Sequence, residues 1–369
     1  GGIGCDLAAY SRDGAPDVVL PKFKVKAKAL VKKLPQLQDL LQEILINSRF
    51  DDEKRVRELL DQCRASMEIQ LLRAAHQVTA ARLASYFSPA GRYNEKGGLS
   101  FYQFLKELTD NFSDRYQHLQ EKLEQLLPVA FSRKNLLISL TAEEKYYDAY
   151  ASMMITLCHC FAEGKEGADA SAFQTEKKNE GLMTSSQVQY VSKGANFIKL
   201  GYAFHGSMRV LETILRYDYF WTKIRVQGGA YGAFTSFKRN GDMLFGSYRD
   251  PNLAETIRVF DATAEYLRDF TVSDREMVKY IIGTMSGVDA PLTSKMRGEA
   301  AAECYIRSVT LEDRQQLRDE ILATRQADIA ALAGLVGACM KENYLCVLGD
   351  EEKIKESQAL FGTVQAVFS

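Results

Sequence analysis

Hydrophobic residues recur along much of this chain with the spacing of amphipathic helices. After Pro35, four aliphatic residues from Leu37 to Ile44 fall at i, i+3, i+4 and i+7, so their side chains share one helical face. Asp51 or Asp52 is a suitable cap for a long helix that runs towards Tyr86. The same periodicity predicts helices over 101–127, 143–161, 207–221, 253–267, 301–307, 311–323, 326–340 and 351–358, and a capping box at 273–276 opens another.

Other stretches alternate between apolar and polar residues, which is the pattern of strands. In residues 22–30, Phe23, Val25 and Ala27 alternate with lysines, which predicts a hairpin with residues 1–11 across a polar loop. Asn240-Gly241 marks a tight hairpin turn within residues 226–248. Short strands are predicted at 136–140, 188–197 and 344–348, and a loop at 88–98. Hairpins with helices gathered between them indicate an α+β fold class, in which a mixed or antiparallel sheet is covered on one face by helices.

The chain also repeats itself, which predicts two homologous domains. Residues 1–14 align without a gap with 228–241, residues 50–53 with 272–275, and residues 135–145 with 343–353, at offsets that shrink from 227 to 222 to 208. We therefore expect one domain over 1–162, a polar linker over 163–180 and a second domain over 181–369. The second copy has strand and helix sequence ahead of its Gly-Gly pair, whereas the first begins at that pair. We expect the chain to be part of a longer protein whose preceding segment completes the first domain.

Composition excludes several functional classes. The 369 residues carry a net charge of −1, so no basic surface argues for nucleic acid or an anionic membrane as partner. Seven cysteines, an odd number scattered through apolar contexts, favour a reducing compartment over a disulfide scaffold. The expected location is therefore the cytoplasm, or an organelle if the parent protein is eukaryotic.

One segment of the second copy carries candidate chemistry. Gly228, Gly229, Ala230 and Gly232 surround Tyr231, and Arg225 precedes them. Small residues in a strand allow another backbone to come close, so this segment is a candidate place for binding a peptide. The alternative is a β-bulge with a core tyrosine. In the first copy Gly4 stands in place of Tyr231, so the phenol belongs to the second copy alone.

The spacing of this pair sets a geometric condition. In a regular strand, six residues would separate Arg225 from Tyr231 by ~20 Å at about 3.3 Å per residue. Gly228-Gly229 must therefore bend the chain if both side chains act on one peptide group. Each could then donate a hydrogen bond to a carbonyl oxygen that becomes negative during reaction.

The sequence lacks a complete catalytic set. Its four histidines, His76, His118, His159 and His205, do not occur in H-E-x-x-H or H-x-x-E-H. Cys158-His159-Cys160 places three ligand types together, but neighbours on a helix point in different directions. No phosphate-binding loop and no G-x-S-x-G occurs either. We expect this chain to bind no metal itself.

The glycine segment resembles a known family. Arg225 through Ala233 is similar to the substrate-binding motif in the C-terminal half of presequence-protease-like zinc peptidases, which include falcilysin and belong to the pitrilysin/insulinase clan. The resemblance extends over almost the whole chain, with further similarity at 21–26, 84–93 and 135–139. It implies a clamshell of four homologous domains, with zinc bound by the first domain and peptides cut between the halves.

On this resemblance the chain is the third and fourth domains. It implies that Tyr231 and Arg225 are the catalytic residues of this half and that Gly228, Gly229, Ala230 and Gly232 bind substrate. The parent would be a zinc metalloendopeptidase with unfolded peptides as substrates, and the N-terminal half, which holds the zinc ligands, would be the partner. The chain departs from the family pattern by lacking that zinc half, so we expect it to be inactive alone. Similar duplicated domains also occur as non-catalytic subunits, and a scaffold with no peptidase role is the alternative.

Overall fold

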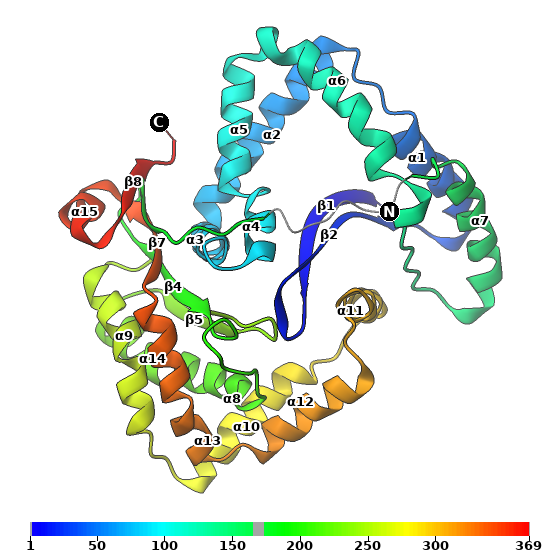
Figure 1. Cartoon of the computed structure of the whole chain (residues 1–369). Coiled ribbons are helices and arrows are strands. Elements are labelled where there is room, and N and C mark those ends of the chain that lie inside the picture. Colours follow the sequence, from blue (N-terminus) through cyan, green and yellow to red (C-terminus); the bar gives the residue numbers. More distant parts are fainter. Residues whose placement is uncertain (1, 165–172, 369) are drawn as a thin grey trace.

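The computed structural model describes residues 2–164 and 173–368. In the view of Figure 1, most helices of the N-terminal part lie at the top and right, the N-terminal hairpin lies in the middle, and the larger sheet and its helices lie at the left and bottom. The fold is α+β, as the sequence predicts, and its two parts differ in how complete their sheets are.

The first part begins with a long hairpin and a pair of helices. β1 (Gly2–Arg12) pairs antiparallel with β2 (Ala15–Lys28), and no other described strand joins them. α1 (Leu34–Ile46) packs on α7 (Tyr147–His159), where Leu41 and Leu157 are buried in one apolar cluster. The short turn η1 (Val31–Lys33) leads into α1. Between α1 and α7 the chain forms helices α2 (Glu53–Arg73), α3 (Ala75–Ala84), α4 (Pro89–Glu95), α5 (Leu99–Asp110) and α6 (Phe112–Ala130) and the short turns η2 (Arg133–Asn135) and η3 (Glu144–Tyr146).

The second part has a six-stranded mixed sheet in the order β5-β6-β4-β7-β3-β8. β3 is parallel to both of its neighbours, whereas β4, β5 and β6 pair antiparallel. β4 and β7 also pair antiparallel, and they are the two central strands of the sheet. The strands are β3 (Asn179–Thr184), β4 (Tyr190–Asn196), β5 (Gly232–Phe237), β6 (Asp242–Tyr248), β7 (Tyr344–Asp350) and β8 (Thr363–Ala366).

Helices from both parts of the chain cover this sheet. Alternate residues of β7 face opposite sides, so Val347 belongs to the cluster under α9 and α14 whereas Cys346 lies under α3. The second part therefore buries one sheet face with its own helices and the other with α3 of the first part. Its helical elements are α8 (Ser207–Ile214), η5 (Leu215–Tyr219), η6 (Trp221–Gln227), α9 (Ala254–Arg268), α10 (Asp274–Val288), α11 (Ser294–Arg307), α12 (Leu311–Ala323), α13 (Gln326–Ala331), α14 (Ala333–Lys341), α15 (Glu351–Glu356) and η7 (Gln358–Leu360).

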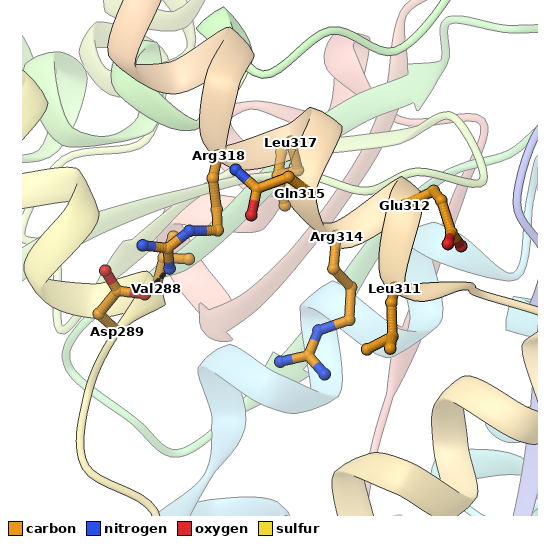
Figure 2. A pocket seen from close by; sticks show the side chains of 8 residues that line it. All are labelled: Val288, Asp289, Leu311, Glu312, Arg314, Gln315, Leu317 and Arg318. Atoms are coloured by element: carbon orange, nitrogen blue, oxygen red, sulfur yellow. Dashed lines mark hydrogen bonds and ion pairs between the residues drawn. The ribbon is translucent and has the colours of Figure 1, made fainter.

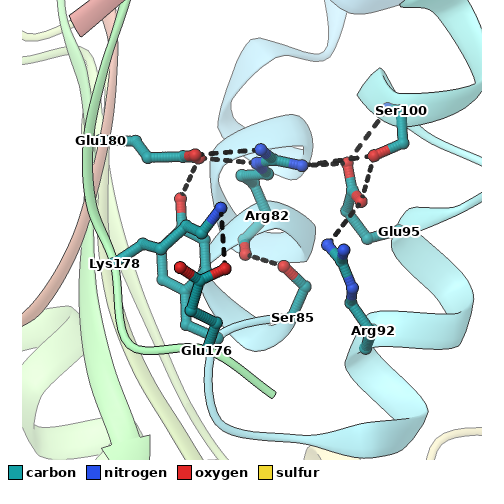
Figure 3. Close-up of polar contacts among 9 residues, drawn as sticks. Arg82, Ser85, Arg92, Glu95, Ser100, Glu176, Lys178 and Glu180 are labelled. Carbon is teal, nitrogen blue, oxygen red and sulfur yellow. Dashed lines mark hydrogen bonds and ion pairs between the residues drawn. The ribbon is translucent and has the colours of Figure 1, made fainter. Parts of the chain in front are cut away.

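A buried ion-pair network joins the two parts (Figure 3). Arg82 of α3 donates to both carboxylate oxygens of Glu180 of β3, at 2.6 and 3.0 Å, and to Glu95 of α4 at 2.9 Å. The Tyr86 hydroxyl donates to Glu180 at 2.5 Å, and the Ser100 hydroxyl to Glu95 at 2.6 Å. Burial alone would raise the pKa of Glu180, but the hydrogen bonds and charge of Arg82 outweigh it and hold that pKa below its usual value.

The tips of the two hairpins also meet. The Gly14 N–H donates to the Arg239 carbonyl at 3.2 Å, and Asp13 forms ion pairs of 2.6 Å with both Arg239 and Arg307. Gly14 and Gly241 both have positive φ, 69° and 92°, and they occupy matching positions in the repeat. Both aligned segments therefore form hairpins with a left-handed glycine at the turn, although the first hairpin has a register shift between Ser11 and Arg12 and the second does not.

Several sequence predictions are wrong in detail. Residues 136–140 form no strand, because β1 and β2 pair with each other and no described strand lies beside this segment. Residues 88–98 are not a loop: Ser88 accepts from the Gly91 N–H at 3.2 Å, and Pro89 at the first position starts α4. The expected helices 52–86 and 101–127 are each broken in two, at Ala74 and Asn111. The last two residues of the expected linker, Asn179 and Glu180, are already β3, and residues 165–172 of it lie outside the described part.

Within the described ranges, no single helix is long and apolar enough to cross a membrane. One pair, α12 with residues 326–341, meets the requirement of length and composition only when two helices bent by 108° are counted together.

Candidate functional site

Arg225 lies on a widened helical turn that ends at the glycine pair. η6 is a π-helix, a form often found at functional sites, and Arg225 lies in its last turn, shortly before the bend. The guanidinium carbon stands 4.1 Å from the Trp221 ring centroid and 5.7 Å from that of Tyr231. The indole face therefore holds the exposed arginine over the tyrosine by a cation–π contact.

The two glycines make the bend for different reasons. The N–H of Gly229 donates to the Arg225 carbonyl at 3.0 Å, and that of Ala230 donates to the Ile224 carbonyl at 3.1 Å, so the chain folds back on the end of η6. A Cβ on Gly228 would stand 2.6 Å from the Ile224 carbonyl oxygen, and Gly229 has a φ of +79°. Both positions therefore require glycine.

The other two small residues have different surroundings. Ala230 is buried in the core of the second part. At Gly232 a Cβ would meet nothing within 4 Å, so this position is open. Of the four predicted small residues, two make the turn, one packs inside and one leaves free space beside Tyr231.

Tyr231 is exposed, which excludes the core-tyrosine interpretation. Its relative exposure is 64%, and its ring stands edge-on to Tyr248 with centroids 5.3 Å apart. Its N–H donates to the Arg249 carbonyl at 3.2 Å, which fixes the backbone just before β5. The phenol is thus held at its base while much of its ring remains accessible.

Residues 248–252, which sequence reasoning missed, support the Gly228-Gly229 bend and Tyr231 through hydrogen bonds and ring packing. The Asn252 side-chain amide donates to the Gly228 carbonyl at 2.6 Å. Buried Asp250 accepts the Asn252 N–H at 2.9 Å and the Thr256 hydroxyl at 2.6 Å, and burial raises its pKa. The signal in the sequence is Asp250-Pro251-Asn252, a turn pattern directly after a predicted strand.

His76 of the first part packs beneath the site, against the aromatic rings of Tyr248 and Phe234. Its ring stands edge-on to Tyr248 at 4.7 Å and to Phe234 at 5.9 Å. Within the described residues its buried Nδ1 has no hydrogen-bond partner, and burial lowers its pKa, so the ring is neutral at pH 7. No local pattern could have placed α3 beneath this hairpin.

The Arg225–Tyr231 site offers hydrogen-bond donors, but the described residues beside it include no metal centre that could hydrolyse a peptide. The guanidinium of Arg225 and the hydroxyl of Tyr231 can both donate to an acceptor oxygen between them. No group of three His, Cys, Asp or Glu side chains in residues 2–164 and 173–368 is placed to hold a metal ion. The residues present do not fit a zinc centre.

A hollow of the surface lies elsewhere (Figure 2). It has a volume of about 620 Å³ and lies between the end of α10 and α12, with Val288, Leu311 and Arg314 among its lining. Arg318 there is paired with Asp289, and the lining shares no residue with the Arg225–Tyr231 pair.

Comparison with known proteins places the chain in a family. Residues 179–348 match the PreP C-terminal domain, and residues 1–108 match a domain associated with subfamily C of the M16 peptidases. The first of these regions begins at Asn179, the first residue of β3. The chain belongs to the M16 peptidases. It corresponds to a C-terminal half of these proteins, as the glycine segment predicts.

Relatives of this M16 chain are longer than the chain itself. Protein HypA of Clostridium perfringens (strain 13 / Type A) is 34% identical over 368 residues, covering 100% of this chain and 38% of HypA. Presequence protease 1, chloroplastic/mitochondrial, of Arabidopsis thaliana is 29% identical, covering 90% of this chain and 31% of that protein. The crystal structure of pitrilysin is similar with a TM-score of 0.54 at 15% identity, covering 94% of this chain and 35% of pitrilysin. The chain thus spans about a third of the length of these proteins and has the pitrilysin fold.

Proposed function

We propose that this M16 chain forms the wall of a peptide-binding chamber in a zinc metalloendopeptidase that degrades unfolded peptides. Arg225 and Tyr231 bind the carbonyl oxygen of the substrate. The observation that carries this proposal is the bend at Gly228-Gly229, which brings the Arg225 guanidinium to 5.7 Å from the exposed Tyr231 ring although six residues separate them.

The chemistry of this pair is stabilisation of negative charge. As a peptide carbonyl is attacked, its oxygen becomes an oxyanion, and donors already aimed at it strengthen their hydrogen bonds. One such donor is typically worth about 10²–10³ in rate. Because Trp221 and Tyr248 hold the two side chains in place, little reorganisation is needed when the charge appears.

The neighbouring strand favours an extended substrate. β5 is an edge strand of the described sheet, and it begins at Gly232, one residue after Tyr231. An unfolded peptide can pair with an exposed strand edge through main-chain hydrogen bonds, which tolerate many side chains. At the far end Glu212 accepts the Phe237 N–H at 2.6 Å, so the part of the edge beside Tyr231 is the proposed binding stretch.

Hydrolysis requires groups that the described residues do not supply. The proposed role of this chain is therefore limited to binding and orienting the peptide and to stabilising its carbonyl oxygen. The zinc ligands and the opposite wall would come from the remaining part of the longer protein, whose relatives extend well beyond the matched region.

Substitution of the pair in the full-length protein tests the proposal. We expect Tyr231→Phe and Arg225→Gln each to lower kcat by about 10²–10³ and also to raise KM, because each removes a donor that binds the carbonyl oxygen of the substrate and strengthens its hydrogen bond in the transition state. Tm and the circular dichroism spectrum should not change, since both side chains are exposed. The measurement is steady-state cleavage of an unstructured peptide.

Tyr305→Phe is the matched control, because Tyr305 of α11 is exposed but lies outside the site. Its kinetics should equal those of the wild type. Unchanged kcat in Tyr231→Phe would remove Tyr231 from the reaction. A full-length protein that neither cleaves nor binds peptides would favour the scaffold role instead.

A further inference from the structure

A continuous strip of side chains leads from Arg225 to a second arginine. Tyr231 lies against Arg225 on one side and, at 5.3 Å between centroids, against Tyr248 on the other. The guanidinium carbon of Arg249 stands 5.6 Å from the Tyr248 ring centroid. Two guanidinium groups therefore flank a pair of tyrosines.

The backbone of Arg249 is in an unusual conformation. Its φ is 48°, in the left-handed region that favours glycine or asparagine. Its carbonyl accepts the Tyr231 N–H, while Asp250 and Gln189 exchange two backbone hydrogen bonds of 2.7 and 2.9 Å. The surroundings thus hold an arginine in a conformation that glycine or asparagine would adopt at lower cost, which points to a use for the side chain.

The charge of Arg249 is not neutralised inside the protein. Across the described ranges, neither Arg249 nor Arg225 forms an ion pair. The adjacent Asp250 turns its carboxylate inward to Asn252 and Thr256, and Lys353 donates to the Pro251 carbonyl at 2.5 Å. A guanidinium stacked on a ring still presents its N–H edge, whose planar fork matches a carboxylate.

We propose that Arg249 is a specificity-determining residue of this site and binds a carboxylate of the peptide whose carbonyl is held by Arg225 and Tyr231. This inference rests on the proposed function. The carboxylate can come from a Glu or Asp side chain or from the free C-terminus of a short peptide, since both present the same two oxygens. Neutral stretches bind through the Arg225–Tyr231 pair and the edge of β5, without a contribution from Arg249.

Binding of labelled peptides to this 369-residue chain tests the inference. Three unstructured peptides of one sequence differ only in charge: Glu with an amidated C-terminus, Gln with an amidated C-terminus, and Gln with a free C-terminus. We expect the wild type to bind at least one carboxylate peptide about tenfold more tightly than the neutral one, as measured by fluorescence anisotropy. The arm that shows the preference identifies the source of the carboxylate. Because the ion pair is exposed, the preference should shrink at high salt.

Arg249→Asn is the decisive variant, because asparagine tolerates positive φ and removes the charge. It should abolish the preference and leave the affinity for the neutral peptide unchanged. Arg268→Gln, which removes an exposed arginine at the end of α9, should leave the preference intact. The inference would be overturned by a wild type that binds the carboxylate and neutral peptides equally well. It would also be overturned by an Arg249→Asn variant that still prefers a carboxylate peptide, or whose affinity for all three peptides falls equally.

The proposed function fails by a different result. Tyr231→Phe and Arg225→Gln should weaken the binding of all three peptides, including the neutral one. If neither substitution changes the affinity for the neutral peptide, or if the wild type binds no peptide, the proposal for the Arg225–Tyr231 site is wrong. The proposed role of Arg249 is then wrong as well.

Discussion

At the scale of single residues, the bend depends on two glycines whose requirements differ. Gly228 has an ordinary φ of −85°, and the obstacle to a side chain there is the Ile224 carbonyl oxygen. At Gly229 a Cβ would make only an ordinary contact of 3.5 Å with Pro251, and the obstacle is the positive φ. A substitution series can therefore separate the steric from the torsional cause.

Gly229→Ala should destabilise the chain by about 1–2 kcal/mol, because alanine is strained at this φ. Gly229→Asn should cost less, since asparagine tolerates the left-handed region. Gly228→Asn should be no better than Gly228→Ala, because both add the Cβ that clashes. The measurement is the free energy of unfolding in urea. Equal losses for Ala and Asn at 229 would contradict the torsional explanation.

Asn252→Ala should weaken peptide binding although Asn252 touches no substrate in the proposed site. The substitution removes the donor to the Gly228 carbonyl, so the position of Arg225 relative to Tyr231 is no longer fixed. We expect a loss of stability of about 1–3 kcal/mol from the unpaired carbonyl, together with a higher Kd for peptides. Asn47→Ala, at the exposed end of α1, is the matched control and should leave that Kd unchanged. An unchanged Kd in Asn252→Ala would show that the turn holds without it.

At the scale of elements, the hairpin of the site shows how loop length sets register. The Lys238 N–H donates to the Asp242 carbonyl at 2.9 Å, so the loop contains three residues and places Tyr248 opposite Gly232. A two-residue loop at Asn240-Gly241 would place Arg249 there instead, one residue out of step. A slip of one residue exchanges the two faces of a strand, so Tyr248 would no longer support Tyr231.

In helix α4, the higher helix propensity of alanine can be tested against the steric cost of a Cβ at Gly91. Alanine is normally better than glycine in a helix by about 1 kcal/mol. A Cβ on Gly91, however, would stand 2.5 Å from the Ala84 carbonyl oxygen, which accepts the Ser88 N–H at 2.9 Å in the turn between α3 and α4. Gly91→Ala should therefore lower Tm.

Gly287→Ala in α10 is the matched control, because nothing lies within 4 Å of its Cβ position. It should raise stability by up to about 1 kcal/mol. If Gly91→Ala were also stabilising, the close approach of α4 to α3 would be wrong.

At the scale of the whole molecule, the two parts of the chain are mutually dependent. The first part contributes α3, which covers one face of the larger sheet, and Arg82, which is paired with Glu180 of β3. It also contributes His76 to the floor of the candidate site. The repeat in the sequence therefore does not correspond to two separately packed units.

Arg82→Met should destabilise the chain by about 3–5 kcal/mol at neutral pH, because Glu180 and Glu95 lose their buried partner. In the wild type the pKa of Glu180 lies below its usual value, so its contribution is complete above about pH 4.3 and is lost as the pH falls through the folded-state pKa. In the variant, burial without Arg82 raises that pKa and the carboxyl can protonate. The difference in unfolding free energy between variant and wild type should therefore shrink on acidification.

The double variant Arg82→Met/Glu180→Met is the control for charge. A well-packed apolar pair can replace a buried ion pair at little cost, so the double variant should recover part of the stability. A double variant as unstable as Arg82→Met would mean that packing or the unpaired Glu95, not the charge of Glu180, causes the loss.

The sequence by itself determined the local features of this protein. Helical periodicity, the Ser273 capping box, the Asn240-Gly241 turn and the Gly-Gly bend depend on residues close together in the chain. The structure has the capping box, the turn and the bend where the sequence predicts them, whereas the expected helices 52–86 and 101–127 are each broken in two. The α+β class follows from these features, whereas the family was expected from the resemblance of Arg225 through Ala233 and of three other segments to a known motif. Arg225 and Tyr231 could be predicted as a pair because the bend that brings them together is encoded by adjacent glycines.

Only the tertiary structure decided what depends on contacts across the chain. Tyr231 alone is compatible with a core position or a surface position, and its exposure is settled by β6 and residues 248–252 behind it. Residues 136–140 have strand-like sequence but no strand beside them in the described chain, and a strand needs a neighbour. His76 and Arg82 reach the second part because helix α3 packs on its sheet. The contact of Arg82 with Glu180 joins residues 98 positions apart, which no local pattern records.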